Sequence, residues 1–375
     1  MTSSGPDHGV TDEASARLAW ARISEPTDPV AVALIERFGF VDAFQIAARG
    51  GRALNGKVID RFAGRLKDLH LDRDREVCER LGARLLLPGN PGWPVALDDL
   101  EVPPWCLWAR GPADFAAVPA RSVAVVGARA STAYGNHVAA EIGAGTGARG
   151  FTVVSGAAFG IDAAAHRSAL SVEAPTVAVL ACGVDRVYPT AHAELIGQVT
   201  RAGGVLTEVP PGSAPTRPRF LARNRLIAAL ATGTVVVEAG LRSGALNTLR
   251  AAARIGRPVA VVPGPVTSMV SAGCHRAVRE EGATLVTDSA EVVDLLGTIG
   301  GADLAPDKRG PSRVEDQVGP LASRVWSTLA PFRSKTVEEI TVHAGLSARE
   351  VLGALGELQG CGLAELRLDG WGRTS

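Results

Sequence analysis

The chain has 375 residues, 46% of them hydrophobic, so it is long enough to bury the cores of two or three domains. Its 39 lysines and arginines balance 39 aspartates and glutamates, which argues against a disordered polyelectrolyte and a uniformly basic binder, although not against a local basic cleft. No apolar run approaches the roughly 18 residues of a transmembrane helix, and no secretory signal is recognisable.

The five cysteines are odd in number, widely spread and without a C-x-x-C pair. This argues against a disulfide framework and a zinc cluster, and we expect a cytoplasmic protein without membrane insertion. Only four of the 39 basic residues are lysines, so any anion site in this chain is built from arginine guanidinium groups, which suit phosphate.

The N-terminal region differs from the rest of the chain. Apolar residues recur at helical spacing from Glu13 to about Leu71, with breaks at Gly39 and at Gly50-Gly51, which predicts a small helical domain over residues 1–72. Residues 83–111 contain a short apolar run and then PGNPGWP, which is typical of a strand and an irregular arm laid over a larger body.

From Ser122, strand-like runs alternate with helix-like runs. Near-continuous valine runs indicate strands that are buried on both faces, so the alternation predicts a mostly parallel, Rossmann-like sheet with helices on both faces, over residues 73–297. The expected strands are Val123–Val126, Thr152–Val154, Val177–Leu180, Gly204–Leu206, Val235–Glu238, Val259–Val262 and Thr284–Val286, and the expected helices include Tyr134–Arg149, Ala191–Ala202, Phe220–Ala231 and Ala245–Ile255.

The C-terminal part begins with a segment rich in Gly, Pro, Asp and Arg, which predicts a linker over residues 298–320. Three helical stretches follow, two of them opened by capping boxes at Thr336 and Ser347, and a possible hairpin closes the chain. This pattern favours a winged-helix domain over residues 321–375, with a generic three-helix module as the alternative.

Glycine-containing loops follow most strands of the expected sheet. In an open parallel sheet, ligands bind beyond the carboxyl ends of the strands, where glycines admit close approach and helix N-termini attract anions. One such loop is an ordinary turn, but several at one edge favour an anion site. The loops are Gly127–Arg129, Ser155–Asp162, Cys182–Asp185, Ala239–Gly244 and Pro263–Pro265.

Motifs for common cofactors are missing from these loops. Gly127–Thr132 lacks the second and third glycines of a dinucleotide fingerprint, and Arg129 stands where a pyrophosphate needs bare backbone. The sequence contains no P-loop, no H-E-x-x-H and no C-x-x-C motif. We therefore expect no cofactor, no metal and no catalytic residue.

The most basic segment is Pro215–Arg225, which has four arginines and no acidic neighbour between Gly212 and Val237. We expect a helix from about Phe220, so Arg217 and Arg219 precede it and are the better phosphate ligands. Arg223 and Asn224 equally fit a structural role, paired with Glu208, Glu238 or strand-end carbonyls, and Arg225 is left open between the two roles.

Two histidines follow the loops. Asp162 and His166 are spaced as an acid/base dyad would be, but a capping aspartate with a hydrogen-bonded histidine is the more common arrangement, and we favour it. His192 follows Tyr188-Pro189 and fits the start of a helix. Neither histidine has a serine or cysteine motif nearby that supports a nucleophile.

In combination, several of these segments resemble the bacterial DNA-processing protein A family (DprA/Smf). The resemblance runs from about Ala83 to Leu296, with a weaker match over the C-terminal domain. It is carried, in order, by Val125–Arg129, Ser155–His166, Gly183–His192, Glu208–Gly212, Phe220 with Arg223–Arg225, Val237–Ala239 with Ser243-Gly244, and Val262–Gly264.

The resemblance implies an extended Rossmann fold, an N-terminal SAM-like domain and a dimer that binds single-stranded DNA without base specificity. It implies a recombination mediator, not an enzyme, which loads the RecA recombinase onto incoming DNA during natural transformation. The family's Gly-Ser-Arg loop is Gly127-Ala128-Arg129 here, so a hydroxyl is lost and the arginine kept. A glycine-rich loop of the N-terminal domain is replaced by the acidic Ser24–Pro29.

The loops and the resemblance together give the candidate DNA-contacting residues. Phosphate contacts fall to the arginines, and the two phenylalanines offer stacking faces, although core packing is the expected fate of Phe220. The candidates are Gly127, Ala128, Arg129, Gly156, Phe159, Gly160, Arg217, Arg219, Phe220, Arg223, Asn224, Arg225, Ser243 and Gly244.

Two other classes of function compete. Phosphoribohydrolases that cleave nucleoside monophosphates have a similar fold with a P-G-G-x-G-T-x-x-E loop; this chain has Ser243–Thr248 instead, although Glu238 and Arg242 could be recruited. A transcription regulator would read duplex DNA with helix Ala348–Gln359, whose Arg349 is accompanied by two glutamates, a pattern that suits a protein contact better.

Overall fold

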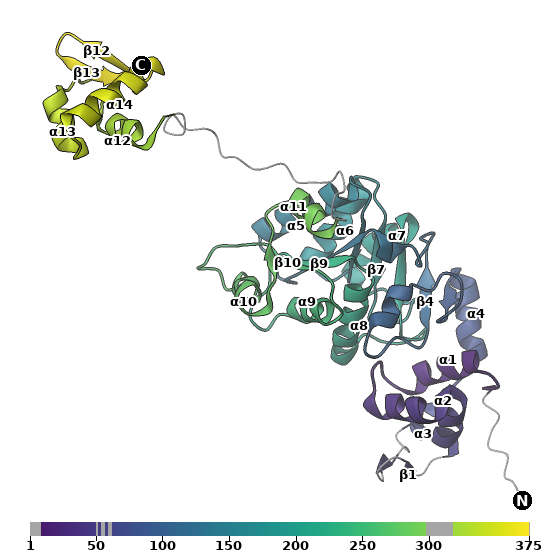
Figure 1. The fold of residues 1–375 in the computed structure, drawn as a ribbon. Helices are drawn as coiled ribbons and strands as arrows, with labels where there is room; N and C mark the ends of the chain where they lie inside the picture. The colour runs from purple at the N-terminus through teal and green to yellow at the C-terminus, as the bar shows by residue number, and fades with distance from the viewer. Residues whose placement is uncertain (1–8, 50–51, 54–56, 59–61, 298–317, 375) are drawn as a thin grey trace, which may run out of the picture. The chain divides into compact units, whose positions relative to one another are not determined.

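The computed structural model describes residues 9–49, 52–53, 57–58, 62–297 and 318–374 (Figure 1). They belong to two compact units, Met1–Ala305 and Pro306–Ser375, and each unit is described by itself. Among the described residues, no helix combines the length and the apolarity needed to span a membrane.

The first unit opens with short helices, as the spacing of apolar residues predicts. Gly39 interrupts the second helix with a φ of 75°, and Trp20 is fully buried against Phe62 and Trp105. Because Trp105 lies between β3 (Arg84–Leu86) and β4 (Leu107–Arg110) of the central sheet, the helices share a core with the body of the unit. The elements are α1 (Glu13–Ile23), α2 (Pro29–Arg49), β1 (Arg52–Ala53), β2 (Lys57–Val58), α3 (Ala63–Leu66) and α4 (Leu71–Leu81).

The body of this unit is a mixed, mostly parallel sheet. Within the described residues it has nine strands in the order β11-β10-β9-β5-β6-β7-β8-β4-β3, and β3 and β4 add an antiparallel edge beside β8. The strands are β3 (Arg84–Leu86), β4 (Leu107–Arg110), β5 (Ser122–Val126), β6 (Thr152–Ser155), β7 (Thr176–Val179), β8 (Gly204–Thr207), β9 (Gly233–Val236), β10 (Val259–Val261) and β11 (Thr284–Leu285).

Helices cover both faces of the sheet, which confirms the predicted fold class (Figure 1). In β5, Val123 and Val125 face one helical layer, whereas Ala124 and Val126 face the other, since successive side chains alternate across a strand. The first layer holds α5 (Ala133–Gly147), α6 (Ile161–Ser171), α7 (Ala193–Ala202) and α11 (Ser289–Leu296), and the second holds α8 (Arg217–Ala229), α9 (Ala245–Arg254) and α10 (Ala272–Glu281).

The start of α8 corrects the sequence prediction. The helix begins at Arg217, three residues before the expected Phe220, because Thr216 caps it and Pro218 fits its first turn. Arg217 and Arg219 therefore belong to the first helical turn rather than to the preceding loop. This places Phe220 one turn deeper in the helix than expected.

The second unit contains the predicted three helices and hairpin: α12 (Pro320–Thr328), α13 (Val337–Ala344), α14 (Ala348–Gly360), β12 (Ala364–Arg367) and β13 (Gly370–Arg373). Both capping boxes form, with Glu339 and Glu350 as the third helical residues. The core is built around Val325, Ile340 and Leu355. The winged-helix assignment and the domain boundaries at 72, 297 and 320 stay predictions.

Candidate functional site

A cleft opens where β5 and β9 lie side by side. The chain leaves β5 through α5 on one face of the sheet and leaves β9 through α9 on the other, so the loops after these two strands diverge. The cleft has a volume of about 720 Å³. Eight of the candidate residues line it: Gly127, Arg129, Arg217, Phe220, Arg223, Asn224, Ser243 and Gly244.

An arginine and two aromatic rings meet in the cleft. The guanidinium group of Arg129 lies 4.8 Å from the ring centroid of Phe220, and the Tyr188 ring centroid lies 5.5 Å from the same point. Arg129 and Tyr188 are exposed, and Phe220 is half-buried at the cleft rather than in the core, which corrects the sequence expectation. The cleft therefore combines a cation with π-faces.

Tyr188 was absent from the sequence candidates, although it lies within one of the segments that carried the family resemblance. It is 42% exposed and lines the cleft. Arg242, in the loop after β9, also lines the cleft. The sequence analysis named it only as a residue that a phosphoribohydrolase could use. An arginine inside a glycine-containing loop after a predicted strand was the sequence signal that could have identified it.

Two arginines of the cleft have guanidinium groups that are free to bind a ligand. Arg217 and Arg242 are exposed, and neither has a hydrogen-bond or ion-pair partner among the residues that the structure describes. Such groups can donate paired hydrogen bonds to a phosphate or carboxylate.

Arg223 and Asn224 support the loops behind the cleft, which agrees with the structural role that the sequence analysis gave them as an alternative to DNA contact. Arg223 is only 5% exposed and donates hydrogen bonds to the carbonyl oxygens of Gly156, at 2.9 Å, and Val179. Burial lowers the pKa of its guanidinium group to about 10. Asn224 donates from Nδ2 to the carbonyl of Gly244 at 3.2 Å. These bonds tie the loops after β6 and β9 to α8.

The glycines of the β6 loop pack the protein against itself. A Cβ at Gly156 would collide with the Arg223 guanidinium, and one at Gly160 would collide with the carbonyl oxygens of Ala128 and Arg129. Gly160 also has a φ of 76°, in the left-handed region. Gly160 therefore lets the β6 loop pack against the β5 loop that carries Arg129, and Gly156 lets it pack against Arg223 of α8; neither glycine lines the cleft.

The predicted roles of the two histidines are confirmed, since His166 is hydrogen-bonded and His192 begins α7. However, Asp162 does not cap α6, whose N-cap is Gly160. Asp162 accepts hydrogen bonds from the backbone N–H of Gly156, at 3.1 Å, and of Ala158, and burial raises the pKa of its carboxyl. His166 bonds instead through Nδ1 to Thr176 Oγ1 at 2.7 Å, and burial lowers its pKa to about 3. The two side chains therefore do not form a dyad.

Phe159 and Ala128 also lie outside the cleft lining. Phe159 is 47% exposed and its ring packs against His192, whose Nδ1 bonds to the carbonyl of Ala157. Ala128 contributes a carbonyl that accepts the N–H of Ile161 at 3.2 Å.

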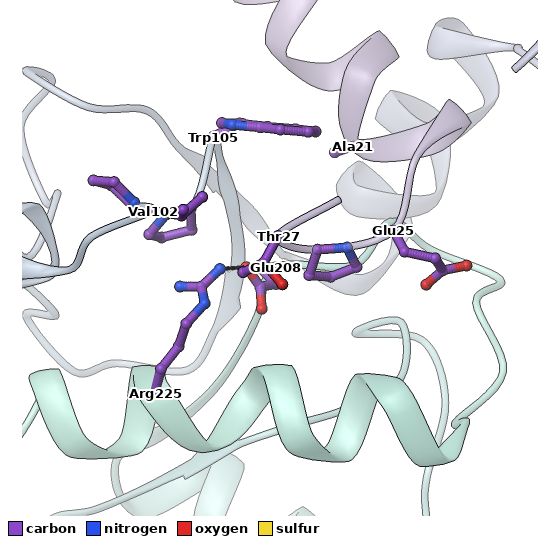
Figure 2. Close-up of a pocket in the computed structure, with 10 residues that line it drawn as sticks. Ala21, Glu25, Thr27, Val102, Trp105, Glu208 and Arg225 are labelled. Atoms are coloured by element: carbon purple, nitrogen blue, oxygen red, sulfur yellow. Dashed lines mark hydrogen bonds and ion pairs between the residues drawn. The ribbon is translucent and has the colours of Figure 1, made fainter. Parts of the chain in front are cut away.

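Arg219 and Arg225 are already ion-paired. Arg225 pairs with the buried Glu208 in a small pocket below Trp105, as Figure 2 shows. Arg219 pairs with Glu25 of the N-terminal helices. Glu25 lies 194 residues before Arg219, so the sequence around this arginine gave no sign of the contact. Glu208 was expected to pair with Arg223 or Asn224 and pairs with Arg225 instead.

Glu238, which could have served a hydrolase, holds a loop. It is 2% exposed and accepts hydrogen bonds from Thr132, at 2.9 Å from the backbone N–H and 2.6 Å from Oγ1. Within the described residues, no group of three or more His, Cys, Asp or Glu side chains could hold a metal ion.

Comparisons with known proteins bear on the family to which the chain belongs. A family model described as "DNA recombination-mediator protein A" matches residues 84–297. The "Putative DNA processing protein DprA" of Mycobacterium tuberculosis is 44% identical over 367 residues, which cover 94% of this chain and 93% of the relative. The DNA processing protein DprA of Streptococcus pneumoniae is 38% identical over 201 residues, 54% of this chain and 70% of the relative.

Two solved structures are also similar. The X-ray structure of DNA processing protein A from Streptococcus pneumoniae has a TM-score of 0.61 at 30% identity and covers 76% of this chain and 97% of that one. DNA processing protein A from Helicobacter pylori, described for its single-stranded DNA binding mode, has a TM-score of 0.52 at 28% identity and covers 57% of this chain and 95% of that one.

Proposed function

This chain belongs to the DNA recombination-mediator protein A (DprA/Smf) family, and on that basis we propose that it binds single-stranded DNA in the cleft beyond β5 and β9. The observation that carries the proposal is the arrangement of unpaired guanidinium groups beside two aromatic rings that line the cleft. Arg129, Arg217 and Arg242 would contact phosphates, while Tyr188 and Phe220 would stack on bases.

Binding of this kind does not depend on base sequence. Charge neutralisation responds to the phosphate backbone, and every base offers a π-face for stacking. A duplex keeps its bases stacked and paired inside, so only the phosphate contacts remain available to it. The cleft should therefore prefer single strands over duplexes.

The finer role follows from the family. We propose that the protein protects incoming single strands and loads the RecA recombinase onto them, that it acts as a homodimer, and that it works in the cytoplasm during natural transformation or recombination. Two linked clefts on one strand would raise the apparent affinity through effective concentration. Recombinase loading is tested by RecA filament assembly on covered single strands, with and without this protein.

A binding role is favoured over catalysis by the position of Glu238. A carboxylate that is buried and accepts two hydrogen bonds from Thr132 is poorly placed to act on a nucleotide. A phosphoribohydrolase-type enzyme stays the alternative function.

The proposal is tested by fluorescence anisotropy with a labelled oligo-dT and a matched duplex at two salt concentrations. We expect tighter binding to the single strand, weakened by salt. Equal affinity for both forms, or hydrolysis of a nucleoside monophosphate without strand binding, would overturn it in favour of the alternative.

A further inference from the structure

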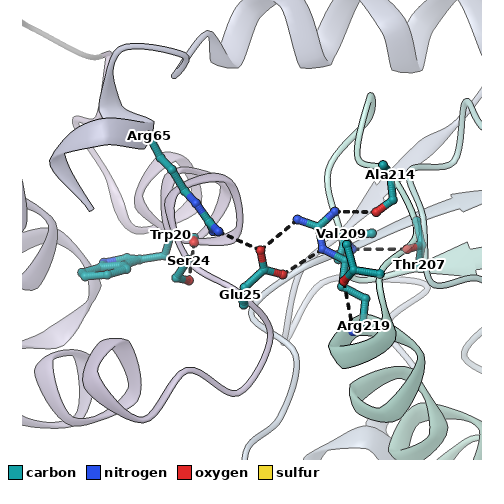
Figure 3. A network of polar contacts seen from close by, with 9 residues as sticks. Trp20, Ser24, Glu25, Arg65, Thr207, Val209, Ala214 and Arg219 are labelled. Atoms are coloured by element: carbon teal, nitrogen blue, oxygen red, sulfur yellow. Dashed lines mark hydrogen bonds and ion pairs between the residues drawn. The ribbon is translucent and has the colours of Figure 1, made fainter. Parts of the chain in front are cut away.

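The N-terminal helices reach α8 through one carboxylate. Glu25 lies in the acidic loop between α1 and α2, and its two oxygens accept hydrogen bonds from Arg219, at 2.8 Å from Nε and 3.1 Å from Nη2. Arg65 of α3 donates to the same carboxylate at 2.8 Å. Figure 3 shows the two guanidinium groups converging on Glu25 from different sides.

This contact has the geometry that arginine adopts with phosphate. Two nitrogens of one guanidinium group face two oxygens of one anion, which is the paired arrangement common to carboxylate and phosphate ligands. Arg219 keeps Nη1 for the carbonyl of Ala214 at 2.7 Å, so its fork is fixed in place. Partial burial of Glu25 would raise its pKa, but Arg219 and Arg65 outweigh that effect and hold the pKa below its ordinary value.

Arg219 also lies next to the cleft. It shares the first turn of α8 with Arg217, which lines the cleft. A second groove of about 380 Å³ is lined by Glu25, Arg219 and Leu221, and Leu221 lines the cleft as well. Leu221 is 48% exposed and borders both spaces, so a strand leaving the cleft across it would reach Arg219.

We propose that Arg219 is a phosphate-binding subsite of the cleft and that Glu25 occupies it in the absence of DNA. A backbone phosphate of the bound strand would replace the carboxylate on the Arg219 fork, and Glu25 would keep Arg65 as its partner. The acidic loop then competes with the strand and lowers the affinity of the resting protein. This inference rests on the single-strand binding proposed above.

The test compares Glu25→Gln with Glu13→Gln in the full-length protein, using anisotropy with labelled oligo-dT. Both variants lose one negative charge in the N-terminal region, but among the described residues Glu13 pairs with Arg17 of its own helix. We expect Glu25→Gln to bind about 3- to 10-fold more tightly than wild type, the range for one partly exposed charged contact. Its salt dependence should steepen by about one phosphate contact, and Glu13→Gln should match wild type.

Arg219→Ala, alone and combined with Glu25→Gln, completes a double-mutant cycle. In the wild-type background it should change affinity little, because Glu25 already occupies the arginine, whereas in the Glu25→Gln background it should abolish the gain. The inference is overturned if Glu25→Gln binds no more tightly than Glu13→Gln, or if the gain survives the loss of Arg219.

Failure of the proposed function gives a different result. If the wild type and every variant ignore oligo-dT, single-strand binding itself is wrong and the subsite falls with it. Thermal unfolding checks that Glu25→Gln is folded. If Glu25→Gln does not fold, Glu25→Asp replaces it in the test, because aspartate keeps the charge but is too short to hold Arg219 as well. This variant should bind oligo-dT more tightly than wild type, by a smaller factor than expected for Glu25→Gln. An affinity equal to that of wild type would contradict the subsite.

Discussion

The guanidinium group of Arg129 lies 4.8 Å from the ring centroid of Phe220, although the two residues are far apart in the sequence. Arg129 follows β5, and Phe220 belongs to α8 on one face of the sheet. Their contact places a cation and a π-face at the mouth of one cleft, which is the combination that non-specific single-strand binding uses.

Replacing Phe220 by Leu should weaken binding of oligo-dT by about 1–3 kcal/mol, the usual contribution of one stacked base. The slope of affinity against salt should stay unchanged, because no phosphate contact is lost. Anisotropy at several salt concentrations measures both quantities. Phe159→Leu is the control, since Phe159 is exposed but packs outside the cleft lining; an equal loss in this variant would place the stacking surface elsewhere.

Gly160→Ala should lower both stability and DNA affinity. A backbone with a φ of 76° and a ψ of −124° costs an L-residue about 1–3 kcal/mol, and the new Cβ would push the carbonyls of Ala128 and Arg129 away. Gly244→Ala is the matched control for stability, because Gly244 has an ordinary φ of −63° and open space at its Cβ position. Thermal unfolding of both variants measures the difference. Equal midpoint temperatures would refute this role of Gly160.

Glu238→Ala should reduce the free energy of unfolding by about 2–4 kcal/mol, because the backbone N–H of Thr132 and its hydroxyl lose a buried charged partner. Denaturant unfolding measures the loss. A variant of unchanged stability that had instead lost a nucleotide-cleaving activity would support the enzyme alternative.

Stability should fall as the pH drops below about 6.5, owing to His166. Its pKa is about 3 in the folded protein against 6.5 unfolded, so the unfolded chain binds the proton first, and folding loses about 1.4 kcal/mol per pH unit in this window. The stabilisation is complete above pH 6.5 and is lost progressively between pH 6.5 and 3. Melting temperatures from pH 7.5 to 5 measure the effect.

The matched variant for this pH dependence is His166→Gln, which should flatten the curve between pH 6.5 and 5. The buried carboxyls of Asp162 and Glu208 have raised pKa values and act in the opposite direction at lower pH, so the difference between the two proteins isolates the histidine. Parallel curves would show that His166 does not titrate in this way.

The sheet and its loops could be predicted because their signals are local. Valine runs such as Val123–Val126 mark strands buried on both faces, and the loop after each strand contributes to the same edge. The supporting role of Arg223 was also foreseeable, since a strand-end carbonyl lay within reach of any helix that starts there. The fold and eight of the residues that line the cleft could therefore be predicted from the sequence.

The partners of the arginines were not predictable in the same way. Glu25 and Glu208 reach Arg219 and Arg225 only through the packing of the N-terminal helices and β8 against α8. The position of Phe220 was missed for a local reason, since the capping signal of Thr216 was overlooked and the helix was started too late. A shift of one turn changes which side chains face the cleft.

The most direct test of the account is the salt dependence of oligo-dT binding by Arg129→Ala/Arg217→Ala, measured against Arg167→Ala/Arg201→Ala. Both double variants lose two positive charges, but Arg167 and Arg201 lie on α6 and α7, outside the cleft. The account predicts that only the cleft variant loses its preference for single strands, with a slope against log salt reduced by about 2. Equal behaviour of the two variants would contradict it, because binding would then follow net charge rather than this cleft.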